Sequence, residues 1–203
     1  MAEISLCMIV RDEEDVLRRC LESAAPLVDE IIIADTGSKD KTCEIAREFT
    51  DQVYHFDWCD DFAAARNFAF SKASKPFCMW LDADDVILPE DQQKFLARKG
   101  ELEQADVVMM PYHTGFDEAE TVVYTFDRER IVRSSPQYRW QGRIHEVIVP
   151  AGRIVLWEAA VTHKKLRVHD PDRNLRIFEA MRAAGEEFSA RDQYYYGREL
   201  MFH

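Results

Sequence analysis

Apolar runs of strand length alternate with amphipathic stretches through the first 85 residues of the chain. The runs at residues 4–10, 31–34, 53–56 and 77–81 are almost wholly apolar, the pattern of parallel strands covered on both faces. Between them, apolar residues recur at helical spacing, with Asp12 and Asp61 as expected N-caps and Pro26 and Pro76 as expected breaks. This alternation predicts βαβ units, and so a Rossmann-like, mostly parallel α/β sheet flanked by helices.

The pattern changes at residue 107. Strand-like pieces at residues 107–110, 121–126, 131–132, 144–149 and 154–162 follow one another without helices between them, which predicts a mixed or antiparallel extension of the sheet. Beyond residues 170–172 the apolar positions return to helical spacing, as far as a cluster of three tyrosines at 194–196. We therefore expect a Rossmann-like half at 1–106, a β extension of the same domain at 107–170 and C-terminal helices at 171–203, which would begin a truncated helical repeat region.

Composition narrows the class of protein. With 203 residues, 47% hydrophobic and 32% charged, the chain suits one globular α/β domain. The net charge of −12 argues against a protein that coats nucleic acid, and no apolar run approaches the roughly 20 residues that cross a bilayer. The N-terminus lacks the features of a secretory signal, so a cytoplasmic location is expected. The cysteines form no CxxC pair and are expected to be buried thiols in a reducing compartment; they are Cys7, Cys20, Cys43, Cys59 and Cys78.

Charged residues follow three of the predicted strands. The acids Asp82, Asp84 and Asp85 come directly after the fourth strand, where ligands of open α/β sheets bind. Acids so close repel one another unless a cation neutralises them, and carboxylates select Mg²⁺ or Mn²⁺. A solvated turn is the alternative. Because Arg11 follows the first strand and Asp35 the second, charged groups line one edge of the sheet, which favours a pocket.

Four segments, in this order and spacing, resemble family 2 glycosyltransferases of the GT-A fold: Met8 to Glu14, Asp35 to Thr42, Phe62 to Asn67 and Trp80 to Asp85. The segment Trp140 to Glu146 is similar to the acceptor-side segment of bacterial members that modify lipopolysaccharide cores or peptides. The tyrosine-rich C-terminal helices look like the start of helical repeats that are fused to some members. The resemblance implies an inverting enzyme that moves a sugar from a nucleoside diphosphate sugar, of the uridine type, to a saccharide, lipid-linked or peptide acceptor.

The resemblance also implies roles for residues of the donor side. Asp35 would bind the base, while Ser38 and the following helix N-terminus would lie near the nucleotide; an Asx turn and an N-cap are the structural alternatives. Arg66 would reach phosphate or ribose, with a surface ion pair to Asp60 or Asp61 as its alternative. Arg11 and Asn67 complete the expected donor site.

The expected metal site holds Mn²⁺ or Mg²⁺. The resemblance makes Asp84 a direct ligand and places Asp82 on ribose or on metal-bound water. His163 would be a further ligand, although a lone histidine is more often structural. Lys164 and Lys165 would offer positive charge to the departing diphosphate.

The general base is expected to be Glu146, with His145 as the alternative. Alternation along a strand at 144–149 would place the two side chains on opposite faces, so that only one enters the site. A salt bridge from Glu146 to Arg143 or Arg139 is the structural alternative. Two other functions stay open: a sugar nucleotidyltransferase, against which the glycine-free segment at residues 10–14 counts, and a non-catalytic interaction module.

Overall fold

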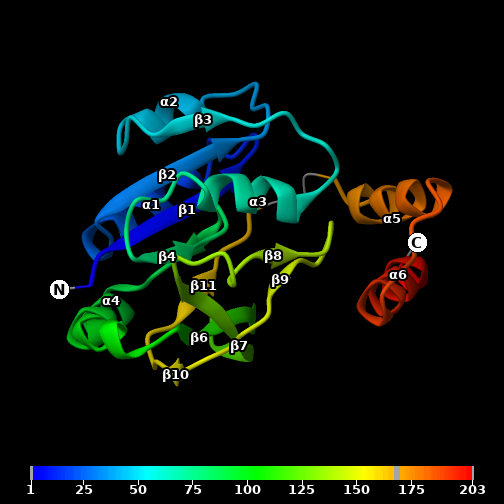
Figure 1. Ribbon diagram of the computed structural model, residues 1–203. Helices are drawn as coiled ribbons and strands as arrows, with labels where there is room; N and C mark the ends of the chain where they lie inside the picture. Colours follow the sequence, from blue (N-terminus) through cyan, green and yellow to red (C-terminus); the bar gives the residue numbers. More distant parts are fainter. Residues whose placement is uncertain (1, 167–169, 203) are drawn as a thin grey trace.

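The computed structural model describes residues 2–166 and 170–202 of the chain. Its centre is a mixed sheet in the order β3-β2-β1-β4-β7-β6-β11-β5, with β10 paired to β6. The four strands predicted in the first half are confirmed, and they pair in parallel: β1 (Ile4–Val10), β2 (Glu30–Asp35), β3 (Val53–His55) and β4 (Phe77–Trp80). Their carboxyl ends therefore meet at one edge of the sheet (Figure 1).

Helices cover both faces of this parallel half, which explains why β1 and β4 are almost wholly apolar. On one face the core contains buried residues of α1 (Leu17–Ala24), α2 (Thr42–Arg47) and α4 (Pro89–Arg98). On the other face α3 (Phe62–Phe70) packs with Trp140 and Ile148. Two 3₁₀ turns, Ala25–Leu27 and Lys99–Gln104, extend α1 and α4.

The helix ends confirm one predicted cap and correct another. Asp61 caps α3, because its carboxylate accepts a hydrogen bond from the Ala64 amide at 2.8 Å. Asp12 is not a cap: α1 begins at Leu17, and Asp12 has a φ of 54° in the turn before it. The sequence pattern did not predict α4, since the only apolar residue it buries is Phe95. A helix without an apolar stripe gives no periodic signal.

The predicted mixed extension is confirmed, with different strand limits. A long hairpin of β6 (Val107–Phe116) and β7 (Val122–Arg133) joins the sheet through β7, which pairs antiparallel with β4. The pieces expected at 121–126 and 131–132 are both parts of β7. They looked separate because residues 127–130 are all charged. Glu129 and Arg130 are nonetheless buried.

The strand expected at 144–149 is wrong. Only β9 (Val147–Ile148) is extended there, paired with β8 (Trp140–Gln141). The preceding residues 142–146 form a bend, in which Gly142 and His145 have φ values of 90° and 50°. The stretch at 154–162 likewise divides into β10 (Ile154–Leu156) and β11 (Val161–His163), and β11 pairs with the short β5 (Asp85–Val86).

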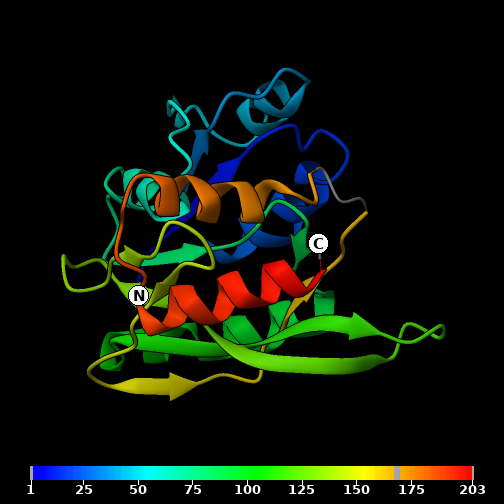
Figure 2. The same cartoon turned by 90° about the vertical axis from the view of Figure 1, so that its right-hand side faces the viewer.

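The C-terminal helices are confirmed as α5 (Arg173–Ala183) and α6 (Ala190–Phe202). Ile177, Phe178 and Met181 of α5 pack on Ile144 of the bend. α6 buries none of its residues. Both helices lie beside the sheet, on the side to which the parallel strands point (Figures 1 and 2).

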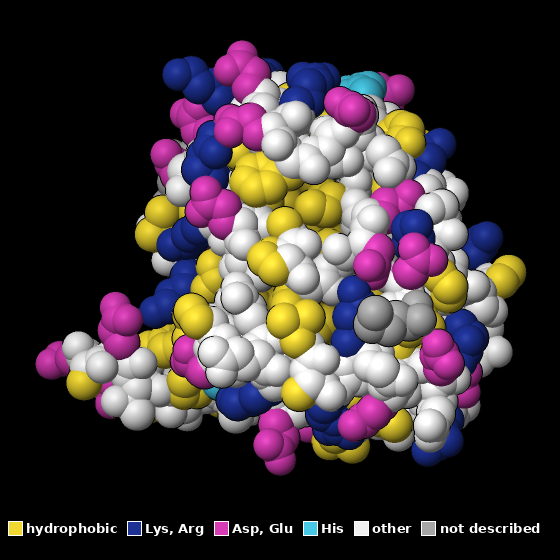
Figure 3. Space-filling model, turned by 90° about the vertical axis from the view of Figure 1, so that its left-hand side faces the viewer, with side chains coloured by type: hydrophobic (Ala, Val, Ile, Leu, Met, Phe, Trp, Pro, Cys, Tyr) yellow, Lys and Arg dark blue, Asp and Glu magenta, His cyan; other side chains and the backbone are white. Residues whose placement is uncertain are grey.

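The expectation of buried cysteines holds for Cys7, Cys20 and Cys78, but Cys43 is half-buried and Cys59 is exposed. Cys59 lies in the polar loop before α3, outside any apolar pattern. On the face turned away from α5 and α6, acidic and basic side chains are interspersed with apolar ones (Figure 3). Within the described residues, no helix combines the length and the apolar character needed to cross a membrane.

Candidate active site

A cleft of about 830 Å³ opens at the carboxyl ends of the parallel strands. Its walls come from the ends of β1 and β4, from α3, from the bend at 142–146 and from α5 and α6. Eight of the residues predicted from the sequence for the site line it: Arg11, Arg66, Asp82, Asp84, His145, Glu146, His163 and Lys165. Asp35, Ser38 and Asn67 do not belong to its lining.

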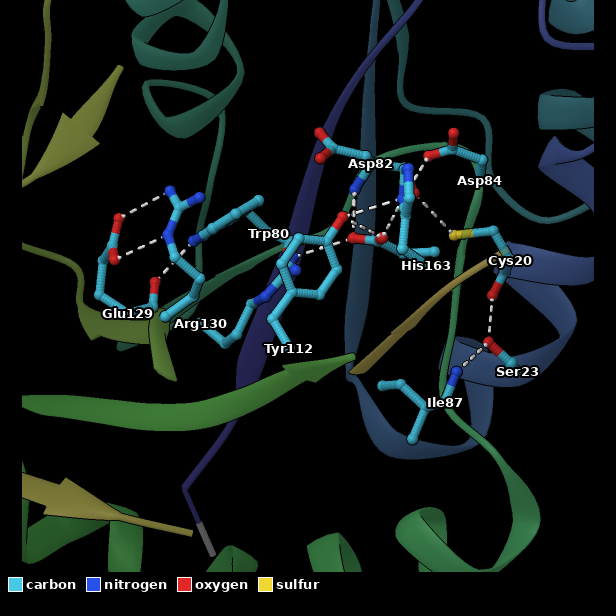
Figure 4. A network of polar contacts seen from close by, with 12 residues as sticks. Cys20, Ser23, Trp80, Asp82, Asp84, Ile87, Tyr112, Glu129, Arg130 and His163 are labelled. Carbon is cyan, nitrogen blue, oxygen red and sulfur yellow. Dashed lines mark hydrogen bonds and ion pairs between the residues drawn. The ribbon is translucent and has the colours of Figure 1, made fainter. Parts of the chain in front are cut away.

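Asp84, Asp85 and His163 form a group with the chemistry of a metal site. Each offers one ligand atom, and these atoms lie within 4.8 Å of one another. The fold brings them together because β11 pairs antiparallel with β5, which sets His163 opposite Asp85. The Lys164 amide also donates to the Asp84 carbonyl at 2.9 Å. Figure 4 shows the His163 ring between Tyr112 and Asp84, with the Asp82 carboxylate directed elsewhere.

Asp85 is the structural anchor of this group. One of its carboxylate oxygens accepts from the Tyr112 hydroxyl at 2.8 Å and lies 3.3 Å from His163 Nδ1. The other accepts from the Asp82 amide at 3.0 Å and from Arg130 at 2.9 Å. Because both oxygens are hydrogen-bonded within the protein, Asp85 has less freedom than Asp84 to turn towards a ligand.

Arg130 is the cation beneath the group, and neither it nor Tyr112 was predicted from the sequence. Its guanidinium is fully buried and lies 3.9 Å from the centre of the Trp80 ring and 4.2 Å from that of Tyr112. A buried charge needs a partner, and Asp85 supplies it. In the sequence, Arg130 lies in a run of four charged residues that gives no sign of burial.

The charge of His163 follows from its neighbours. Burial alone would lower the pKa of its imidazole, but Asp84 and Asp85 outweigh that effect and raise the pKa to about 10. A metal ion bound by this nitrogen would have to displace its proton, and the ion would then supply the positive charge beside the two acids. Two carboxylates and one imidazole, together with open space in the cleft for phosphate and water, are a donor set that fits Mn²⁺ or Mg²⁺.

Arg66 links the acidic turn to the bend. It is buried, and it donates from Nη2 to Asp82 at 2.6 Å and from Nε to Glu146 at 2.5 Å. Its guanidinium lies over the rings of Trp80 and Trp140, at 5.1 and 4.8 Å from their centres. Burial would raise the pKa of Asp82, but Arg66 and Arg130 lower it to about 2.

These contacts replace the ion pairs considered as structural alternatives. Arg66 pairs with Asp82 and Glu146, not with Asp60 or Asp61. Glu146 pairs with Arg66 of α3, not with Arg143 or Arg139 as its structural alternative had it. Arg66 Nη1 is buried without a hydrogen-bond partner among the described residues.

Three predicted donor-site residues have structural contacts. The Asp35 carboxylate accepts from the amides of Gly37 and Ser38, as in the Asx turn considered for it. The Ser38 hydroxyl accepts from the Asp12 amide and so joins two strand-end loops; it does not cap α2. Asn67 bonds with both ends of its amide to the backbone of Trp140, at 3.0 Å each.

His145 and Glu146 point to different surroundings, although no strand alternation separates them. The Glu146 carboxylate meets Arg66 at the cleft. The His145 ring stacks on Tyr195 of α6 and contacts Glu199. Of the two expected basic residues, Lys165 lines the cleft, whereas Lys164 pairs with Glu120 at 3.1 Å.

Comparison with known proteins relates this arrangement to a family. A TPR repeat-containing protein of Synechococcus elongatus is 37% identical over 79% of this chain and 41% of its own length. The glycosyltransferase SunS of Bacillus subtilis is 30% identical over 70% of this chain and 34% of SunS. The lipopolysaccharide core biosynthesis glycosyltransferase LpsC of Rhizobium meliloti is 29% identical over 74% of this chain and 58% of LpsC. The aligned part is thus well under two thirds of each relative.

The solved structures of Staphylococcus aureus TarS share the architecture. The structure of TarS residues 1–349 superposes with a TM-score of 0.59 at 14% identity, over 98% of this chain and 70% of that one. This likeness confirms the GT-A fold that the sequence resemblance implied. The family model described as glycosyl transferase family 2 matches residues 5–160. The chain therefore belongs to glycosyltransferase family 2.

Proposed function

We propose that this chain is the catalytic domain of a metal-dependent, inverting glycosyltransferase that uses a UDP-linked sugar. The observation that carries the proposal is the grouping of Asp84, Asp85 and His163 in a cleft at the carboxyl edge of the parallel strands. Family membership supports the reaction class. The TarS structures in complex with UDP and with UDP-GlcNAc support the choice of nucleotide.

Asp84 and His163 would hold Mn²⁺ or Mg²⁺, with Asp85 fixing the position of the histidine. Such a cation would neutralise charge on the diphosphate leaving group. Asp82 was expected to share the metal, but its carboxylate already binds Arg66. We therefore assign Asp82 and Arg66 together to the ribose and phosphate side of the donor, because both side chains line the cleft and a guanidinium suits phosphate.

The reaction would be a single in-line displacement. An acceptor oxygen or other nucleophile attacks the anomeric carbon, the bond to the diphosphate breaks, and the acceptor proton goes to a base. We assign the base to Glu146, because its carboxylate reaches the cleft while the His145 ring is held by α6. Arg66 orients this carboxylate, as a single in-line displacement requires.

Each of the three parts of the chain would have its own role in the reaction. Residues 1–106 would bind the donor. Asp35 would face the nucleobase, and Arg11 would lie at the entrance of the cleft. Ser38 would join the strand-end loops, and Asn67 would hold β8 in place. Residues 107–170 would face the acceptor, and residues 171–203 would close the cleft and begin a helical repeat region. The acceptor would be a saccharide, a lipid-linked sugar or a peptide.

The test is release of UDP from a panel of UDP-sugars, with water or a trial acceptor, in Mn²⁺ and in EDTA. We expect release only with the metal. Asp84→Asn should lower it at least a hundredfold, on the order of the loss of one strong transition-state charge contact, while the matched surface variant Asp51→Asn keeps it. A parallel incubation with UTP and a sugar 1-phosphate tests the rival reaction, since release of pyrophosphate there would indicate nucleotidyl transfer. No turnover with any donor would favour a non-catalytic module.

A further inference from the structure

Three side chains on one side of α6 contact His145. Arg191, Tyr195 and Glu199 follow one another at spacings of four residues, so they lie along a single face of the helix. Arg191 donates two hydrogen bonds to the His145 carbonyl, at 3.1 and 2.9 Å. The Tyr195 ring stacks on the imidazole with 4.0 Å between centres and 14° between planes. Glu199 lies 2.9 Å from His145 Nε2.

The residue held in this way has a backbone conformation that needs support. His145 has a φ of 50°, in the left-handed region that non-glycine residues occupy at a cost. Such a conformation persists where its surroundings fix it. Two further contacts of the bend come from the C-terminal part of the chain: Arg143 pairs with Glu186, between α5 and α6, at 2.6 Å, and Ile144 packs on α5. From α3, the Phe62 amide donates to the Arg143 carbonyl at 2.8 Å.

The next residue along the chain is Glu146, whose carboxylate binds Arg66 in the cleft. A change in the backbone at His145 therefore redirects Glu146. α6 buries none of its own residues in the domain, so its contacts serve the bend more than the core. Tyr195 and Arg191 also belong to the cleft lining, which places the helix within the site.

We infer that α6 is a positioning element for the catalytic carboxylate: Arg191, Tyr195 and Glu199 clamp His145 so that Glu146 faces the reaction centre. This inference rests on the proposed role of Glu146. It assigns His145 a positioning role and makes turnover dependent on a helix outside the residues matched by the family model.

Tyr195→Ala removes the stacked ring and tests the clamp. Tyr194→Ala is the matched control, since Tyr194 is the same residue type on the same helix but is 62% exposed. Its ring meets the Tyr195 ring edge-on, with 5.2 Å between centres, so this variant also shows whether the clamp needs that neighbour. Tyr195→Phe keeps the ring and should behave as the parent. Glu199→Gln serves as a second clamp variant in case Tyr195→Ala does not fold, and Glu146→Gln shows the loss that follows when the base itself is absent.

Three measurements are made on each variant: UDP affinity in Mn²⁺, the rate of UDP release from the best UDP-sugar, and hydrogen exchange of the amides at 142–147. For Tyr195→Ala we expect roughly a tenfold or larger loss of kcat, because small misplacements of a catalytic group cost that much. UDP affinity should stay within about twofold, and exchange at 142–147 should quicken. Tyr195→Phe and Tyr194→Ala should match the parent.

Parent-like kcat or unchanged exchange in Tyr195→Ala and Glu199→Gln would overturn the inference and leave the proposed function intact. An equal loss of UDP affinity and turnover would also overturn it, because that result indicates general destabilisation. If the parent releases no UDP, the proposed function fails, and the exchange measurement alone then decides whether α6 holds the bend.

Discussion

At the scale of single residues, the site depends on pairs of charges that are far apart in the sequence. Arg130 and Asp85 are both fully buried, and each is the other's ion-pair partner at 2.9 Å. Arg66 joins Asp82 to Glu146 in the same manner. A buried ion pair does not by itself stabilise a fold, but loss of one partner leaves a charge without compensation. Both pairs therefore hold acids in place at the edge of the cleft.

Arg130→Met tests this view of the buried pair. The variant removes the fully buried cation of Asp85 and leaves the His163 ring, at 3.3 Å, beside that carboxylate, so the free energy of unfolding should fall by about 3 kcal/mol. Urea denaturation measures it. Arg18→Met is the control, since Arg18 pairs with Glu48 on the surface and exposed pairs contribute little. Equal midpoints for the two variants would contradict the anchoring role of Arg130.

At the scale of elements, the sequence predicted those whose signal is local. The parallel strands and α3 are marked by unbroken apolar runs, by helical spacing and by the Asp61 cap. The bend at 142–146 has no such mark, because contacts from α5 and α6, some fifty residues away, determine its shape. The same holds for the site: the family resemblance pointed to Asp84, His163 and Glu146, which line the cleft, whereas nothing in the sequence pointed to Arg130 or Tyr112.

The β6–β7 hairpin gives a prediction at this scale. Gly115 faces Tyr124 across the hairpin, and a Cβ added to the glycine would lie 2.7 Å from the Tyr124 Cβ. Gly115→Ala should therefore shift the strands and destabilise the domain by about 1 to 3 kcal/mol, which a thermal melt detects. Gly100→Ala is the matched control, because nothing lies within 4 Å of its added Cβ. A melting temperature of Gly115→Ala equal to that of the parent would show that the two strands can move apart at this position without a loss of stability.

At the scale of the whole molecule, charge is distributed unevenly. A net charge of −12 repels an anionic nucleotide sugar in general. The cleft counters this, because its acids are matched by a set of cations that line the same walls: Arg11, Arg66, Arg128, Lys165, Arg173, Arg176 and Arg191. A ligand that enters the cleft meets these charges together. Because Asp84 and His163 line the same cleft, such a ligand should bind most tightly together with a divalent cation.

Thermal unfolding with UDP tests this dependence on the cation. A ligand that binds only the folded state at a hundred times its dissociation constant adds about 2.7 kcal/mol of stability. For a domain of this size that raises the melting temperature by roughly 5 to 10 °C. We expect this rise with UDP and Mn²⁺ together, and little change with UDP in EDTA, because the diphosphate would then face Asp84 without an intervening cation. Asp84→Asn should keep the parent's melting temperature without ligand, since the change is nearly isosteric, but should lose the joint effect. The same rise with UDP in EDTA would mean that the arginines bind the nucleotide unaided and that the acidic group is not a metal site.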